Sequence, residues 1–228
     1  MPARFPHPCR LFLFDLDGTL IDSKSDIAES VNRALARVAV PRVPVARIAE
    51  FVGNGVRVLI QRALTEALTA EPEPELMQGT MQAYLQDYEA HLLDSTTLYP
   101  GVRESLDTLG WAEMAVITNK PESFSRRILE SLGVAGHFRI ILGGDSGVRR
   151  KPDPAPLQSV MAECGVAANQ TVMVGDSQVD ISAGKAAGVF TCGICGGFRP
   201  AVELEKAGCD LIVWGVREMP PYFCPAIP

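Results

Sequence analysis

The sequence is poor in lysine, histidine and cysteine, and it contains no long apolar run. Its 228 residues include 21 lysines and arginines against 27 aspartates and glutamates, which gives a formal net charge of −6. This balance argues against nucleic acid or an acidic membrane as a partner. The six cysteines are too sparse for a disulfide scaffold in a chain of this length. No stretch approaches the roughly 20 apolar residues that span a bilayer.

What the sequence does contain suits a globular protein. Hydrophobic residues make up 47% of the chain and charged residues 21%, which is enough for a buried core. The first apolar run, Leu11–Phe14, is cut short by Asp15 and is too short for the core of a signal peptide. We therefore expect a soluble, cytoplasmic monomer or homodimer that binds a small molecule. Because lysine is scarce, a lysine within a motif is informative.

Six short apolar runs predict the strands of an α/β core. The runs are continuous rather than alternating, which indicates burial on both faces and hence a parallel sheet covered by helices. Ligands bind such sheets outside the carboxyl ends of the strands, where polar residues follow several of these runs. The predicted strands are Leu11–Phe14, Met114–Ile117, Ile140–Leu142, Val172–Val174, Val189–Ile194 and Leu211–Val213.

Residues 24–93 contain no convincing strand and carry three helical patterns, at Asp26–Val38, Val56–Leu68 and Glu75–Leu92. An all-helical block after the first strand predicts an inserted domain. The expected organisation is an α/β core of residues 1–22 and 96–228 with a helical cap domain of residues 23–95. The closing PPYFCPAIP cannot form a helix or an inner strand, so we expect a docked or loose tail.

Acidic residues follow two of the predicted strands. Asp15 and Asp17 precede the turn residues Gly18 and Thr19, and two such carboxylates can act as nucleophile, acid or base, or metal ligands. An ordinary Asp-Gly turn is the alternative. After a later strand, an aspartate is followed by another four residues on, and this pair can face one magnesium ion or can simply cap a helix. The pair is Asp176 and Asp180.

Two further motifs offer neutral donors and a positive charge. Thr118, Asn119 and Lys120 follow a strand and carry donors of the kind that hold phosphoryl oxygens, although such residues often only cap a helix. Lys151 lies before Pro152, which keeps the segment extended and lets it present one ammonium group inward. A solvated basic loop is the alternative.

Taken together, these motifs indicate phosphoryl transfer. A carboxylate that attacks a phosphate dianion is repelled by it, so the site needs a divalent cation, a fixed ammonium and hydrogen-bond donors. The four motifs supply these parts in order, at the same end of one predicted sheet. The sequence therefore predicts a magnesium-dependent phosphatase acting on a small phosphorylated metabolite.

The motifs FDLDGTLIDS, VITNK, RRKPDP and VGDSQVD resemble, in order and approximate spacing, the four motifs of the haloacid dehalogenase superfamily. This resemblance implies a Rossmann-like core with a helical cap. It implies that Asp15 is the nucleophile and Asp17 the general acid and base, and that Lys151 neutralises the phosphoryl group. The remaining implied roles are phosphoryl binding by Thr118 and Asn119, and Mg²⁺ binding by the Asp15 side chain, the Asp17 carbonyl and Asp176, with Asp180 completing the site. Gly18, Thr19 and Lys120 are also expected to bind the phosphate group or the substrate.

Within the superfamily, segments such as FVGNGVRVLIQRAL and ITNKPESF resemble the phosphoglycolate phosphatase group, which makes 2-phosphoglycolate the expected substrate. Asn54 and Arg57, at a predicted helix start, suit the substrate's carboxylate, although this segment can equally be a plain helix start. The alternatives are a phosphatase for another metabolite (a nucleotide, a sugar phosphate or pyrophosphate), a sugar phosphomutase, or a non-catalytic interaction protein on the same fold.

Two other pairs of residues are assigned to packing. Cys192 and Cys195 resemble half of a zinc or redox site, but no second pair completes it, so buried apolar cysteines are expected. Trp111 and Trp214 are predicted to lie in the core rather than to stack on a ligand.

Overall fold

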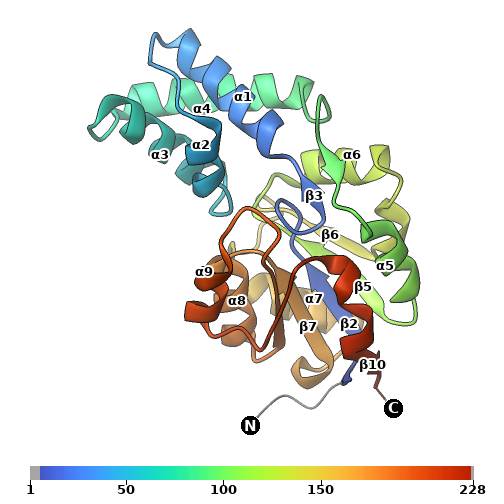
Figure 1. Cartoon of the computed structure of the whole chain (residues 1–228). Coiled ribbons are helices and arrows are strands. Elements are labelled where there is room, and N and C mark those ends of the chain that lie inside the picture. The colour runs from blue at the N-terminus through green and yellow to red at the C-terminus, as the bar shows by residue number, and fades with distance from the viewer. Residues whose placement is uncertain (1–5, 227–228) are drawn as a thin grey trace. The chain divides into compact units, whose positions relative to one another are not determined.

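The computed structural model describes residues 6–226, and the chain divides into two compact units (Figure 1). The larger unit runs up to Asp22 and resumes at Leu98, and the smaller unit is Ser23–Thr97. The sequence placed the first boundary at the same residue and the second two residues earlier. A two-stranded sheet of β3 (Ile21–Asp22) and β4 (Thr97–Leu98) lies where the chain passes between the units.

The larger unit is built on a parallel sheet of six strands in the order β6-β5-β2-β7-β8-β9, which confirms the predicted α/β fold. Each predicted apolar run corresponds to one of these strands. Their bounds are β2 (Leu11–Phe14), β5 (Glu113–Ile117), β6 (Ile140–Leu142), β7 (Thr171–Gly175), β8 (Phe190–Ile194) and β9 (Leu211–Val213).

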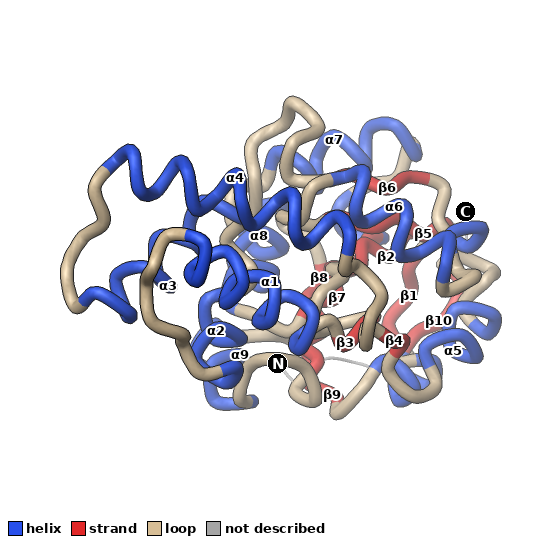
Figure 2. The backbone as a smooth tube through the Cα atoms, turned by 90° about the horizontal axis from the view of Figure 1, so that it is seen from above, coloured by secondary structure: helices blue, strands red, loops and turns tan. Residues whose placement is uncertain are grey.

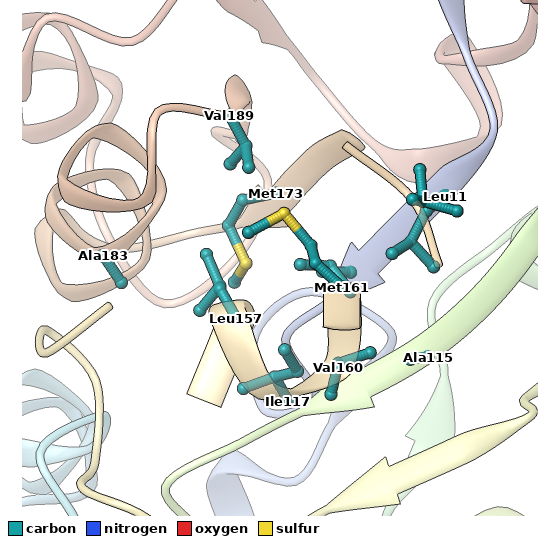
Figure 3. Close-up of a cluster of buried hydrophobic side chains, with 11 residues drawn as sticks. Leu11, Ala115, Ile117, Leu157, Val160, Met161, Met173, Ala183 and Val189 are labelled. Carbon is teal, nitrogen blue, oxygen red and sulfur yellow. The ribbon is translucent and has the colours of Figure 1, made fainter. Parts of the chain in front are cut away.

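Both faces of the central strand β2 are covered. Successive side chains of a strand point to opposite faces. Leu11 and Leu13 therefore share one face, where they pack with Leu157 and Val160 of α7 (Ala155–Cys164) in a fully buried cluster (Figure 3). Ala183 of α8 (Gln178–Ala187) belongs to the same cluster.

Aromatic rings cover the opposite face of β2. The ring of Phe12 lies edge-on to Phe223 at a centroid distance of 5.1 Å, and Phe14 contacts Phe138 at 6.2 Å. This two-sided burial explains why the run is continuously apolar.

The other helices of this unit are α5 (Val102–Thr108), α6 (Glu122–Ser131) and α9 (Ala201–Ala207), with short 3₁₀ helices η1 (Ala135–His137), η2 (Ala168–Gln170), η3 (Val216–Glu218) and η4 (Pro220–Tyr222).

The end of the chain is docked rather than loose. After η4, strand β10 (Phe223–Pro225) pairs in parallel with β1 (His7–Cys9), so the segment forms no inner strand, as predicted. The prediction that it forms no helix is wrong for Pro220–Tyr222, which form the 3₁₀ helix η4, because proline is tolerated in the first turn of a helix. Pro8 and Pro225 are tolerated because this two-stranded sheet consists only of edges. The last two residues of the predicted tail, 227 and 228, lie outside the described residues.

The prediction that both tryptophans lie in the core is wrong. Trp111 is 40% exposed and Trp214 is 63% exposed. Trp111 lies in the turn before β5, and Trp214 directly follows the edge strand β9, where the sheet has no further strand to cover one side.

The smaller unit is entirely helical apart from the residue that it contributes to β4 (Figure 2). The three predicted helices are present, together with one that the sequence did not indicate, α2. Only seven residues long and preceded by Pro44, α2 is too short for a helical period to stand out. The bounds are α1 (Lys24–Arg37), α2 (Val45–Phe51), α3 (Val56–Leu68) and α4 (Pro74–Ala90). Among residues 6–226, no helix has both the length and the apolar character needed to cross a membrane.

Candidate active site

Asp15 and Asp17 follow strand β2 at its carboxyl end. The Asp15 amide donates to the carbonyl of Val174 on β7 at 2.8 Å, which extends the sheet pairing to the first acid. Gly18 then adopts φ +87°, and a Cβ there would lie 2.2 Å from Oδ2 of Asp176. Only glycine allows this turn, so the loop after β2 and the loop after β7 approach closely.

Lys151 reaches into the site from the loop before α7. Its Nζ donates to Oδ1 of Asp15 at 2.9 Å and to Oδ1 of Asp180 at 2.6 Å, and its side chain is 2% exposed. The neighbouring Arg149 side chain is 83% exposed. Within the basic segment RRKPDP, Lys151 therefore points inward and is buried, whereas Arg149 is exposed to solvent.

Three carboxylates meet beside this lysine. Ligand oxygens of Asp15, Asp176 and Asp180 all lie within 4.8 Å of one another, and all three residues are buried. Burial and the charge of Asp180 raise the pKa of Asp15 to about 7, although Lys151 opposes the shift. Burial and the charges of Asp15 and Asp180 hold the pKa of Asp176 well above its usual value. Burial alone would lower the pKa of Lys151, but the two carboxylates outweigh it and raise this pKa to about 12.

The charge of this cluster fits a divalent cation. If all three carboxylates are ionised, the single ammonium of Lys151 leaves about two negative charges in a buried region; this is costly without a counter-ion and is the reason that the pKa values of Asp15 and Asp176 are raised in its absence. Oxygen ligands of this kind suit a hard cation. The cluster can therefore hold a metal ion through Asp15, Asp176 and Asp180.

Asp180 is the third residue of helix α8 and helps to cap its start. Its Oδ2 accepts hydrogen bonds from the backbone N–H and the hydroxyl of Ser177, at 3.1 and 2.6 Å, in a capping box. The sequence left two roles open for Asp180, a helix cap or an ion-binding acid. The structure is compatible with both, because Oδ2 caps the helix while Oδ1 accepts a hydrogen bond from Lys151.

The turn after β5 brings Thr118, Asn119 and Lys120 to the same edge of the sheet, and all three are buried. The Asn119 amide donates to the carbonyl of Lys151 at 2.8 Å, so it fixes the lysine loop. Oγ1 of Thr118 accepts from the Lys120 amide at 3.2 Å. The Lys120 ammonium lies 2.6 Å from Oδ1 of Asp17.

Thr19, which follows Gly18 in the first motif, is fully buried, and its hydroxyl has no hydrogen-bond partner in the described structure. The two expected cap residues belong to the smaller unit. Gly55, with φ 85°, precedes α3, so Asn54 lies just before the helix and Arg57 is its second residue, exposed to solvent.

The expectation of buried cysteines holds for Cys192, which is fully buried with a raised thiol pKa caused by that burial. Cys195 is only half-buried, because it follows the end of β8. Both thiols are free. Within residues 6–226, the three aspartates are the one group of histidines, cysteines and acids close enough to hold a metal ion.

The model of the family described as haloacid dehalogenase-like hydrolase matches residues 12–194. The chain belongs to this family. The matched range of this haloacid dehalogenase-like hydrolase runs from β2 through β8 and includes every residue that the sequence assigns to catalysis, substrate binding or metal binding, and the expected resemblance is confirmed.

Curated relatives and solved structures agree with this assignment. This hydrolase is 40% identical over 219 residues to the phosphoglycolate phosphatase of Pseudomonas putida, covering 93% of this chain and 79% of the relative. It is 35% identical to the phosphoglycolate phosphatase of Nitrosospira multiformis, covering 94% and 95%. It is also similar to the crystal structure of a predicted phosphoglycolate phosphatase from Haemophilus somnus, with a TM-score of 0.87, 32% identity and coverage of 92% and 96%.

Sequence reasoning about the hydrolase missed one segment of the site, the loop after β8. The Phe198 amide donates to Oδ2 of Asp176 at 2.7 Å. A Cβ on Gly197 would lie 2.2 Å from the Gly18 carbonyl oxygen and 2.6 Å from Cβ of Asp176. The signal that could have found this loop is the Gly196-Gly197 pair directly beyond a strand's carboxyl end.

Proposed function

We propose that this protein is a magnesium-dependent phosphatase that hydrolyses 2-phosphoglycolate to glycolate and phosphate. One observation carries the proposal: a buried ammonium, that of Lys151, lies within hydrogen-bond distance of Asp15 and Asp180, beside a third acid, Asp176. The names of the relatives support phosphoglycolate as the substrate.

In the first step, an oxygen of Asp15 attacks the phosphorus of the ester. The new bond joins this oxygen to phosphorus, the bond from phosphorus to the glycolate oxygen breaks, and Asp17 gives its proton to that oxygen. Lys151 offsets the charge of the phosphoryl group, and Thr118 and Asn119 hold its oxygens. Mg²⁺ bound by Asp15, Asp176, Asp180 and the Asp17 carbonyl would supply further neutralisation of the negative charge.

In the second step, water attacks the phosphorus of the aspartyl-phosphate. Asp17, now ionised, takes a proton from this water, the bond between phosphorus and Asp15 breaks, and inorganic phosphate leaves. Asp15 returns as a carboxylate and Asp17 as an acid, so the site is restored. In this proposal Gly18 and Thr19 shape the loop that carries both acids, and Lys120 lies beside Asp17.

The experiment is a phosphate-release assay with magnesium and a matched set of esters. 2-Phosphoglycolate is compared with glycerol 2-phosphate, glucose 6-phosphate, a nucleoside monophosphate and pyrophosphate. We expect kcat/KM for 2-phosphoglycolate to exceed the others by about tenfold or more, because a site with groups for a carboxylate discriminates against esters that lack one. Preference for another ester would reassign the substrate, and sugar-phosphate isomerisation without phosphate release would indicate a mutase.

A further inference from the structure

Lys120 forms an ion pair with Asp17, the second acid of the site. Its Nζ lies 2.6 Å from Oδ1 of Asp17, and the two side chains are only 4% and 10% exposed. The residues are 103 positions apart in the chain and come from the ends of neighbouring strands β5 and β2. Removing one partner of a buried ion pair leaves an unpaired buried charge and is costly, whereas an exposed pair contributes little.

The backbone of Lys120 is fixed on both sides. Its N–H donates to Oγ1 of Thr118 at 3.2 Å, and its carbonyl accepts from the N–H of Gly144 at 2.8 Å. A Cβ on Gly144 would lie 2.4 Å from the Asn119 carbonyl oxygen, so the two loops are in close contact. The ammonium is therefore presented to Asp17 from a rigid turn.

The two acids of the first motif are thus served by different lysines. Lys151 contacts Asp15 and Asp180, and Lys120 contacts Asp17. Two of the five lysines in the chain are used in this way. Lys120 thus pairs with the expected acid, Asp17, whereas Lys151 pairs with the expected nucleophile, Asp15. This placement points to a role of Lys120 in the proton transfer that Asp17 performs.

We propose that Lys120 is a positioning residue that holds the Asp17 carboxylate in the orientation from which it gives its proton to the leaving oxygen. Lys120 donates to Oδ1 of Asp17 and so restricts the rotation of this carboxyl group. This inference rests on the proposed function, and it assigns Lys120 to Asp17 rather than to the substrate's phosphoryl group.

The test compares two substrates whose leaving groups differ. Glycolate is a poor leaving group that needs a proton, whereas nitrophenolate leaves without one. For Lys120→Met we expect kcat/KM to fall by about 10- to 100-fold with 2-phosphoglycolate, a part of what acid–base assistance is worth, and by less than about threefold with nitrophenyl phosphate. Lys120→Arg, which restores a cation, should recover part of the loss, and Lys206→Met on the exposed end of α9 is the matched control.

A double-mutant cycle with Asp17→Asn completes the test. If Lys120 acts through Asp17, Lys120→Met should have almost no further effect on 2-phosphoglycolate turnover once Asp17 is changed. Equal losses with both substrates, or additive effects, would overturn the proposal and assign Lys120 to the phosphoryl group. The urea midpoints of the same four proteins measure the ion pair independently of catalysis. A wild-type protein that releases no phosphate from either ester would refute the proposed function, while a non-additive shift in midpoint would still report the pairing.

Discussion

Two buried aspartates, one in each unit, show how neighbours decide what a carboxylate does. In the larger unit, Asp15 lies beside Asp180, and burial with this like charge raises its pKa to about 7. In the smaller unit, Asp26 is 4% exposed and is surrounded by neutral donors. Burial alone would raise the pKa of Asp26, but hydrogen bonds from Ser95 and Thr96 outweigh it, and the pKa lies below its usual value.

The contacts of Asp26 explain this difference. Its two oxygens accept from the Ser95 N–H, each at 3.0 Å, and Oδ2 also accepts from the N–H and hydroxyl of Thr96 at 2.8 and 2.6 Å. The Ser95 hydroxyl donates to Oδ1. These bonds tie the first turn of α1 to a segment about 70 residues later. A carboxylate with its acceptors filled stabilises a fold, whereas a cluster of carboxylates with too little positive charge is suited to a ligand.

Changing each of these two aspartates to asparagine tests the comparison most directly. Asp15→Asn removes the proposed nucleophile, so phosphate release should fall by about 10⁴-fold or more and no phosphoenzyme should form. Its stability should be unchanged or higher, because a buried like charge is removed. Rapid-quench labelling and urea unfolding measure the two effects. A phosphoenzyme in this variant would assign the nucleophile elsewhere.

Asp26→Asn should do the reverse. The new amide turns a donor toward the N–H groups of Ser95 and Thr96, so we expect a loss of about 2–3 kcal/mol in the free energy of unfolding. Turnover per folded molecule should be retained. Glu29→Gln, on the exposed face of the same helix, is the control. Unchanged stability of Asp26→Asn would show that the five hydrogen bonds contribute little.

Asp17 separates the two halves of the reaction. In Asp17→Asn, nitrophenyl phosphate should still phosphorylate Asp15, but hydrolysis of the intermediate should stall for lack of a base. We therefore expect a burst near one equivalent of nitrophenol, no burst with 2-phosphoglycolate, and steady turnover reduced by about 10²–10⁴-fold. Stopped-flow absorbance measures the burst. Steady turnover at the wild-type rate would mean that Asp17 is not the acid and base.

Metal binding can be measured without catalysis. Mg²⁺ should raise the thermal midpoint of the wild-type protein, because a ligand that binds only the folded state stabilises it. Asp176→Asn removes one ligand from the buried cluster, so the Mg²⁺ concentration that gives half of this shift should rise by about tenfold or more. Asp94→Asn, an exposed acid of the smaller unit, should behave as wild type. Equal Mg²⁺ shifts in both variants would place the metal elsewhere.

Arg57 tests recognition of the substrate's carboxylate. Arg57→Ala should raise KM for 2-phosphoglycolate by about tenfold, as expected when one charged contact is lost, and should leave KM for glycerol 2-phosphate almost unchanged. Steady-state kinetics on both esters provide the comparison. Equal effects on the two substrates would mean that Arg57 does not recognise the carboxylate.

The sequence predicted the six-stranded sheet and the residues at its carboxyl edge, because continuous apolar runs and the turns after them are local signals. Parallel strands bring such turns together whatever their distance in the chain. Asp15, Lys151 and Asp176 therefore meet as expected.

Other features depend on information that a short window of sequence does not contain. The pairing of Lys120 with Asp17 is set by side-chain direction between loops 103 residues apart. The hydrogen bond from Phe198 to Asp176 follows from the path of a loop with no periodic pattern. The exposure of Trp214 follows from the position of β9 at the sheet edge, which strand order determines and residue type does not.

The smallest expected effect is the pH dependence of the contribution that Asp26 makes to the free energy of unfolding. The pKa of Asp26 in the folded protein lies below the value of about 3.9 for an unfolded aspartate. Folding therefore favours the ionised form, so this contribution is fully present above about pH 4 and is lost as pH falls through the folded pKa. The gap in unfolding free energy between wild type and Asp26→Asn should be constant at neutral pH and should narrow below about pH 4. The other carboxylates titrate in both proteins, so their effects cancel in the difference in unfolding free energy. The pH dependence of this difference therefore reports Asp26 alone. Urea unfolding from pH 7 down to about 3 measures it. A Ser95→Ala, Thr96→Val background removes the hydroxyl donors and should make the narrowing smaller, whereas a gap that stays constant to the lowest pH would contradict a depressed pKa.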